Sequence, residues 1–265
     1  MNGRRVAVIV RKEWLDMRKN KMVLVMLFLL PVIMVGMILG TTWMMVRMPE
    51  QVQEPIIPDG TPGLPPALAA MNSLDRSLAV LNDQYMFYLL LIPMALPVYI
   101  AAYSIIGEKE TRSLEPVLAT PISTAELLVG KIAAAVTPAV IGAWGSFALT
   151  ALGTYLLASP AVFAYLVRPL WTLGMLVHSP LFAVMSASGG VIASSRLNDP
   201  RAAQQVTALF IVPLIGISLA VLMGKVYLDT TSLLWATPVV LALNAGIIWL
   251  TVRLFQRETI LTRWK

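Results

Sequence analysis

The sequence predicts an all-α integral membrane protein with six transmembrane helices and both termini in the cytoplasm. The chain has 265 residues, of which 58% are hydrophobic and only 13% are charged, and its mean hydropathy is +0.77. A soluble domain is usually about 45–50% apolar and about 25% charged. Six apolar stretches also approach or exceed the roughly 20 residues that a helix needs to cross a bilayer. The third observation is that lysine and arginine gather in alternate connecting segments.

The six predicted spans form one domain over residues 22–265, and no acidic residue lies near the centre of any span. Every span contains proline, which removes a backbone hydrogen bond and kinks a helix. The kinks could act as moving hinges, or could reflect only the higher frequency of proline in membrane helices. The spans lie at about 22–46, 86–106, 127–157, 170–193, 206–223 and 233–252.

The basic residues predict the orientation. With a cytoplasmic N-terminus, all but four of the 20 lysines and arginines lie on the inner side or in the cytoplasmic ends of spans, as the positive-inside rule requires. The four on the outer side are Arg47, Arg76, Arg168 and Lys225. This predicts a multi-pass protein of the cytoplasmic membrane with an even number of spans. The net charge of +6 is therefore interpreted as a topology signal and not as a nucleic-acid surface.

Several function classes are excluded by missing residues. The chain has no cysteine and one histidine, so neither a thiolate site nor a multi-histidine metal site can form. It also has no H-E-x-x-H, G-x-S-x-G or Walker A motif. Without carboxylates inside the spans, a proton- or sodium-coupled carrier is disfavoured. His178, in the fourth span, is expected to stay neutral and to hydrogen-bond to a neighbouring helix.

Two segments outside the spans have helical patterns. In residues 1–21 the apolar residues Val6, Ile9, Val10, Trp14 and Met17 recur at helical spacing between basic residues. This favours a helix lying in the inner interface, although a basic cap on the first span is the alternative. The outer loop at 47–85 begins with a stretch rich in proline and glycine. Its second part, Ala67–Gln84, predicts a short amphipathic helix on the outer surface.

The loop after the second span carries the most informative motif, GEKETRSLEPVLATPISTAELLVGK, from Gly107 to Lys131. Pro116 and Pro121 break it, and Ser123 with Glu126 forms a capping box that starts the helix of the third span. A short helix starting near Thr111 or Ser113 would lie between these breaks. Such a helix could transmit force to both adjoining spans. An ordinary charged loop explains the residues equally well.

This motif resembles the signature of ABC-2 type permeases. The matching residues are Gly107, Glu108, Glu110, Leu114, Glu115, Leu118, Thr120, Pro121, Ile122, Ser123, Glu126, Gly130 and Lys131. The sequence departs from the signature at Arg112-Ser113, where Gly-Thr is usual, and at Pro116. The resemblance also covers the whole plan of a basic N-terminal helix, a first span, an outer loop and five further spans.

The resemblance implies the membrane subunit of an ATP-driven ABC exporter. Such a subunit pairs with a second copy of itself or a related permease, in the lipid membrane, and with two ATP-binding subunits, which carry the ATP and Mg²⁺. It has no catalytic residues of its own. The coupling loop, at 107–126, would contact the ATPase through Glu108, Lys109, Glu110, Arg112, Leu114, Glu115, Val117 and Leu118. The N-terminal helix would add Arg11, Lys12, Trp14 and Arg18.

The substrate path is expected along the seam between two permeases. Phe28, Tyr88 and Phe210 are candidates for lining it, and packing or lipid contact explains each of them as well. The cargo stays open among a drug, a lipid, an ion and a glycan. Two other function classes remain: an ATP-independent channel or scaffold, which would tolerate changes in the coupling loop, and an intramembrane enzyme, which would need catalytic side-chain pairs at bilayer depth.

Overall fold

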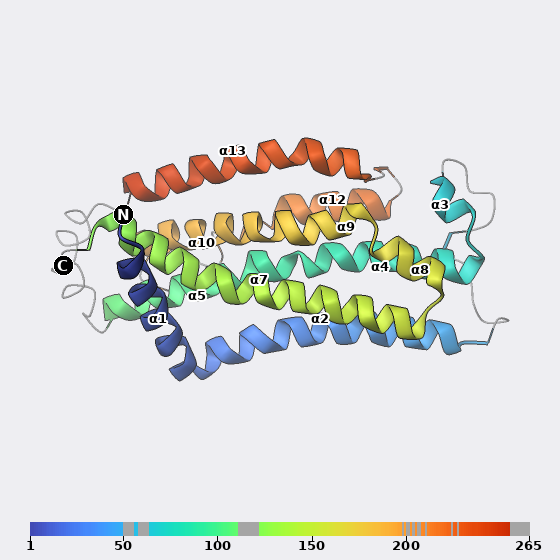
Figure 1. Cartoon of the computed structure of the whole chain (residues 1–265), viewed down its shortest axis with the longest axis horizontal. Coiled ribbons are helices and arrows are strands. Elements are labelled where there is room, and N and C mark those ends of the chain that lie inside the picture. The colour runs from blue at the N-terminus through green and yellow to red at the C-terminus, as the bar shows by residue number, and fades with distance from the viewer. Residues whose placement is uncertain are drawn as a thin grey trace.

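The computed structural model describes an elongated bundle of long helices, which Figure 1 shows with their axes roughly side by side. No strand occurs among the described residues. The described residues are 1–49, 56–57, 64–110, 122–197, 199, 202, 205, 208–209, 211–223, 225–226 and 228–254.

The helices follow one another along the chain with short connections wherever these are described. They are α1 (Gly3–Lys19), α2 (Lys21–Arg47), α3 (Pro66–Ala69), α4 (Ser73–Leu89), α5 (Leu91–Glu110), α7 (Thr124–Leu157), α8 (Pro160–Leu166), α9 (Pro169–Leu173), the π-helix η2 (Gly174–His178), α10 (Ser179–Arg196), α12 (Val212–Leu222) and α13 (Thr230–Leu254).

Five helical runs are long and apolar enough to cross a membrane, which confirms a multi-pass membrane protein. They are Lys21–Arg47, Ser73–Glu108, Thr124–Leu157, Pro160–Arg196 and Thr230–Leu254. They agree with five of the six predicted spans. The remaining span, at 206–223, lies partly outside the described residues. Its described helix α12 has 11 residues and rises about 16 Å, about half of a bilayer core.

Both described ends of the chain lie at one end of the bundle. Figure 1 shows the N-terminus and the last turn of α13 at the same end of the bundle, at the left of the view. The chain therefore returns to the end from which it started, as an even number of crossings requires. The count of six and the assignment of this end to the cytoplasm stay predictions.

Asn20 separates α1 from α2. Its backbone N–H donates to the Met17 carbonyl at 3.0 Å and ends α1. Its side-chain oxygen accepts from the backbone N–H groups of Met22 and Val23, at 3.1 and 3.3 Å, and so caps α2. The same residue thus stops one helix and starts the next, which lets α1 cross the bundle while α2 runs along it (Figure 1).

The helix predicted on the outer surface over Ala67–Gln84 differs from the observed one. The observed α4 begins at Ser73, where Asn72 caps it by accepting from the Asp75 N–H at 2.7 Å, and it continues almost directly into α5. Some polar residues on it are buried together with their partners. Arg76 is 5% exposed and donates to the carbonyls of Leu68 and Met71. The predicted stripe considered only apolar residues, so it placed a packed helix at the surface.

The proline in the fourth span coincides with a change of helix type. In η2 the Ser179 N–H donates to the Gly174 carbonyl, five residues back. Pro180 has no N–H to donate to the next carbonyl, that of Met175. Trp144 of α7 donates to this carbonyl at 2.8 Å, and the Ser179 hydroxyl also donates to it. The helices α7 and η2 are therefore joined where the backbone lacks a donor.

His178, the last residue of η2, is buried and lies 3.3 Å from the Thr237 hydroxyl of α13, measured from Nε2. The expected hydrogen bond to a neighbouring helix is thus confirmed. It gives the α9–α10 run a polar contact with α13.

Candidate functional site

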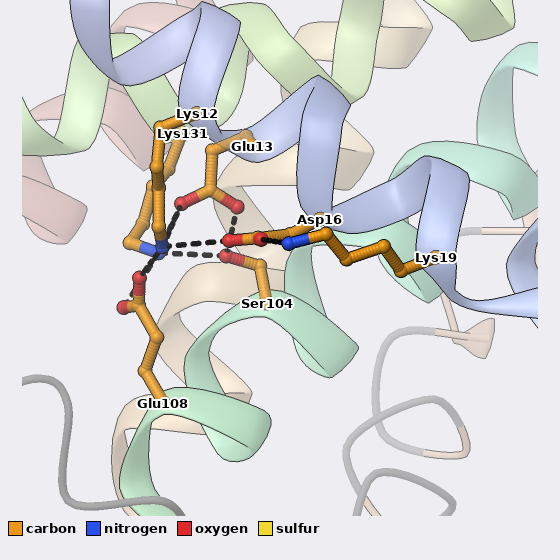
Figure 2. Close-up of polar contacts among 7 residues, drawn as sticks. All are labelled: Lys12, Glu13, Asp16, Lys19, Ser104, Glu108 and Lys131. Atoms are coloured by element: carbon orange, nitrogen blue, oxygen red, sulfur yellow. Dashed lines mark hydrogen bonds and ion pairs between the residues drawn. The ribbon is translucent and has the colours of Figure 1, made fainter.

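Charged side chains from three helices meet near the end of the bundle that holds the N-terminus. Figure 2 shows Lys12 and Glu13 of α1, Glu108 of α5 and Lys131 of α7 directed toward one another, with Ser104 of α5 between them. We call these five residues the charge cluster.

Lys131 occupies the centre of the charge cluster. Its ammonium lies 2.8 Å from Glu13 Oε1 and 2.7 Å from Glu108 Oε2, and it donates to the Ser104 hydroxyl at 2.6 Å. Ser104 in turn donates to Glu13 Oε2 at 2.6 Å. Lys12 forms ion pairs with Glu13, at 3.2 Å, and with Glu108. Two cations and two anions therefore balance one another.

The inner part of the charge cluster is closed to water. The side chain of Lys131 is 1% exposed, that of Glu13 5% and that of Glu108 8%. Removing an ion from water costs several kcal/mol, and a good partner offsets this cost. Each buried charge in the cluster consequently needs the others, so α1, α5 and α7 are held in one arrangement.

Pairing shifts the pKa values of Glu13 and Lys12 in opposite directions. Burial alone would raise the pKa of the Glu13 carboxyl, but Lys131 and Lys12 outweigh this effect and hold the pKa below its usual value. Burial would lower the pKa of Lys12, but Glu13 and Glu108 outweigh it and raise that pKa above its usual value. The Lys12 ammonium and the Glu13 carboxylate are therefore both charged at neutral pH.

Helix α1 also packs directly against the first turns of α7. A Cβ atom added at Gly130 would lie 2.6 Å from the Ile9 Cγ2 atom, so a glycine permits this approach. The Trp14 indole donates to the Ala134 carbonyl at 3.1 Å. Nearer the start of α7, the Asn2 backbone N–H donates to Glu126 Oε1 at 2.7 Å, and Arg5 lies 3.5 Å from Glu126.

The predicted capping box at the start of α7 is confirmed. The Glu126 N–H donates to the Ser123 hydroxyl at 3.2 Å, and the Ser123 N–H donates to Glu126 Oε2 at 2.9 Å. Glu126 thus caps α7 and binds the N-terminus of α1 at the same time. Helix α1 therefore contacts both flanks of the motif from Gly107 to Lys131. It contacts Glu108 on one side of residues 111–121, which lie outside the described residues, and Glu126 and Lys131 on the other.

The predicted coupling residues are only partly described. Glu108 is buried in the charge cluster and paired with Lys12 and Lys131. Lys109 and Glu110 end α5, but their side chains are not described. Arg112, Leu114, Glu115, Val117 and Leu118 lie outside the described residues, as does Phe210.

The predicted residues of the N-terminal helix separate onto two faces. Lys12 joins the charge cluster, whereas Arg11, Trp14 and Arg18 are exposed. The two described candidates for a substrate path lie on different helices. Phe28 of α2 is 65% exposed, and Tyr88 of α4 is half-buried and accepts from Gln84 at 3.2 Å.

The sequence reasoning missed Glu13 and Ser104, and it assigned Lys131 only to the motif. A signal for Glu13 was present. It lies four residues after Ile9 and four before Met17, inside the apolar stripe of α1. A carboxylate on the buried face of an amphipathic helix requires a cationic partner.

A second ion pair ties the helices together at the other end of the bundle. Asp83 of α4 accepts two bonds from the Arg168 guanidinium, at 2.7 and 2.8 Å, and one from the Trp171 indole at 2.7 Å. The guanidinium also lies 3.8 Å from the centre of the Tyr165 ring. This pair fixes the α8–α9 corner against α4 and provides a matched control for the charge cluster.

The family comparison covers this entire arrangement. A family model described as an ABC-2 family transporter protein matches residues 7–252. The matched range includes all of the charge cluster and all of the long apolar helices except the last two residues of α13. The comparison with curated proteins returned no match.

Proposed function

Since this chain belongs to the ABC-2 family of transporter proteins, we propose that it is the permease subunit of an ATP-driven exporter. Two permease subunits would enclose the cargo path between them, and separate ATP-binding subunits would hold and hydrolyse ATP with Mg²⁺. The observation that carries this proposal is the charge cluster, which joins α1 to both helices that border the coupling loop.

The proposed contact with the ATPase is the loop between α5 and α7. Leu114, Val117 and Leu118 would provide its apolar part, and Glu115 would lie among them. Lys109, Glu110 and Arg112 would supply charges at its edge. Because Glu108 precedes this segment and Lys131 follows it, a push on the loop would be transmitted to α5 and α7 together.

The N-terminal helix would move with these two helices. Glu13 accepts from Lys131, and Lys12 is paired with Glu108, so α1 cannot stay in place when α5 and α7 shift without breaking buried ion pairs. On this proposal α1 braces the coupling loop. Arg11, Trp14 and Arg18 are among its exposed residues and would be the ones that contact a partner.

The cargo path is proposed at the seam between two permease subunits. Much of the apolar surface of α2 is exposed, including Phe28, Val32 and Trp43. A membrane helix with this much exposed surface faces either lipid or another subunit. Tyr88 and Phe210 remain the other candidates for the path.

A pull-down tests the proposed contact. The chain is purified in mild detergent from its own cells, and the co-purifying ATPase subunit and its activity are measured for the parent and for Glu110→Lys combined with Leu118→Asp. The matched control, Lys225→Glu with Val226→Asp, makes a similar change between α12 and α13. We expect the ATPase to be lost only with the loop variant, which should still insert into the membrane.

Two results would count against the proposal. If the loop variant retains the ATPase and its activity, the loop is not the coupling contact. If the parent chain purifies without any ATPase, an ATP-independent channel or scaffold becomes the better description.

A further inference from the structure

Three arginines form a line along the outer face of α1. Arg4, Arg11 and Arg18 are spaced seven residues apart, which is close to two helical turns, so they lie on one side about 10 Å from one another. All three are exposed. Their side is opposite the one that carries Ile9 and Glu13, the two buried residues of the helix.

No acidic side chain within the described residues forms an ion pair with this arginine line. The two acids of α1 are already engaged. Glu13 pairs with Lys131 and Lys12, and Asp16 pairs with Lys12 and Lys19. Among the described residues, the arginine line is therefore a row of positive charge without an acidic partner.

Apolar side chains border the arginine line and are exposed as well. Val8 is 66% exposed, Leu15 50% and Trp14 41%. Val8 and Leu15 repeat the spacing of seven residues, so they run beside the arginines. Arginines combined with tryptophan and aliphatic residues on one helix face are typical of helices that lie among lipid headgroups.

The position of α1 puts this face at headgroup depth. The helix packs against the side of α7, at Gly130 and Ala134, and not beyond its end. In Figure 1, α1 crosses the flank of the bundle, and the ends of α5 and α13 extend at least as far. The outer face of α1 therefore points sideways, near the level at which α2 begins its apolar run.

We propose that the arginine line of α1 binds the phosphate groups of anionic membrane lipids. A guanidinium donates two parallel hydrogen bonds to a phosphate, and it keeps its charge at every physiological pH. Val8 and Leu15 would enter the upper acyl region between the bound headgroups, and the exposed edge of Trp14, whose indole N–H donates to Ala134, would lie beside them. Because α1 is joined to α5 and α7 by the charge cluster, lipid bound here anchors the helices that border the coupling loop.

This surface fits a membrane better than the ATPase. The main proposed ATPase contact is the loop between α5 and α7, whereas the arginine line faces away from the bundle axis. The apolar residues beside the arginines continue into the exposed apolar side chains of α2, such as Met22, Val25 and Met26. The inference does not depend on the identity of the ATPase, and its test can fail while the pull-down succeeds.

A lipid titration tests the inference on the whole chain. The detergent-purified protein is titrated with phosphatidylglycerol or with phosphatidylcholine, and the bound lipid is counted by native mass spectrometry while the unfolding temperature is followed. Arg11→Gln with Arg18→Gln is compared with Arg47→Gln and Lys225→Gln. This control removes the same charge from the other end of the bundle.

We expect phosphatidylglycerol to bind the parent and to raise its unfolding temperature more than phosphatidylcholine does. The α1 variant should bind phosphatidylglycerol on the order of 30-fold more weakly, as expected for the loss of two basic residues at a charged membrane surface. The control should behave like the parent. High salt should weaken the parent's binding, and soluble glycerol phosphate should not replace the lipid.

The inference fails if the two lipids act equally, or if the α1 variant binds phosphatidylglycerol as the parent does. If that variant keeps its lipid response but loses the ATPase, the arginine line is a protein contact. Arg11→Lys with Arg18→Lys gives a second measurement should the glutamine variant not fold. It should retain most of the phosphatidylglycerol binding, because the charge is kept.

Discussion

Lys131 places an ammonium group where almost no water reaches it, and three oxygen atoms replace that water. Glu13, Glu108 and Ser104 each lie within 2.8 Å of it. The ammonium donates hydrogen bonds to Glu13 and Ser104, and it forms an ion pair with Glu108. The cost of burial is offset only while both carboxylates remain in place.

Replacing Lys131 alone should therefore strongly lower the stability of the folded protein. In Lys131→Met, the buried carboxylates of Glu13 and Glu108 have Lys12 as their one remaining cation in the charge cluster. Loss of one member of a buried ion pair typically lowers the free energy of unfolding by about 3–5 kcal/mol. Adding Glu13→Gln should recover part of the stability, because Lys12 and Glu108 then still form a complete pair. Thermal unfolding in detergent measures both variants. If Lys131→Met is as stable as the parent, the charge cluster does not hold the helices together.

The pH dependence of stability should follow from the shifted groups. The pKa of Glu13 is lower in the folded protein than its usual value of about 4.3. Its contribution is thus complete above that value and is lost as the pH falls through the folded pKa. Lys12 has a raised pKa, so its contribution is complete below about 10.4 and is lost as the pH rises through the folded pKa. Solvent screening weakens this second contribution, because Lys12 is 42% exposed.

We accordingly expect the gap in unfolding temperature between the parent and Glu13→Gln to stay constant from about pH 6 to 9. The gap should narrow as the pH falls below about 4.3, because the carboxyl of the unfolded chain then binds a proton while that of the folded protein, whose pKa is lower, still does not. Differential scanning fluorimetry across this range measures the gap. A gap that closes near neutral pH would contradict the assigned direction of the Glu13 pKa.

Between α1 and α7, a single missing methyl group decides the packing. The added Cβ atom at Gly130 meets Ile9, whose branched side chain starts at the backbone and has little freedom to move away. At Gly145 on the same helix, the added atom meets nothing within 4 Å. The two glycines therefore differ only in whether α1 lies above them.

Alanine should have opposite effects at these two sites. Gly145→Ala should be neutral or stabilising, because alanine favours a helix by about 1 kcal/mol over glycine. Gly130→Ala should separate α1 from α7 despite the same gain. The chain has no cysteine, so a cysteine introduced at Ala134, which is 1% exposed beneath Trp14, can report the separation by maleimide labelling. Equal protection of this cysteine in both variants would show that α1 tolerates the added methyl group.

Local signals predicted the element boundaries at this site better than its contacts. Ser123 and Glu126 are three residues apart, so their capping box is visible in the sequence and marks the start of α7 correctly. Glu13 and Lys131 are far apart in the chain, and no local pattern reports their pairing. The same holds for Asp83 and Arg168. Helix α4 was misplaced for a related reason, because Arg76 is satisfied by the Leu68 and Met71 carbonyls, which no count of apolar residues includes.

Across the whole molecule, the charge cluster connects the helices that flank the proposed coupling loop to most of the bundle. Helix α5 packs closely on α10, where an added Cβ atom at Gly190 would lie 3.2 Å from the Val98 backbone. The Ser186 hydroxyl of α10 also donates to the Met94 carbonyl of α5. A displacement of α5 would consequently carry α10 with it, while α1 and α7 follow through Glu13, Glu108 and Lys131.

Loosening the charge cluster without unfolding the protein should therefore separate ATP hydrolysis from movement of the spans. Glu13→Gln with Lys131→Met keeps the pair of Lys12 and Glu108 and leaves the coupling loop unchanged, so the ATPase should still bind and hydrolyse ATP. A cysteine replacing Phe28 on the exposed face of α2 reports the movement through its maleimide labelling rate, with and without ATP and vanadate. We expect the nucleotide-dependent change in this rate to fall several-fold in the variant.

The control, Asp83→Asn with Arg168→Gln, breaks the ion pair at the opposite end of the bundle. It should lower the unfolding temperature while keeping the nucleotide-dependent change in labelling rate. If the control loses it equally, general loosening of the bundle explains the effect; if neither variant loses it, the coupling movement does not pass through the charge cluster.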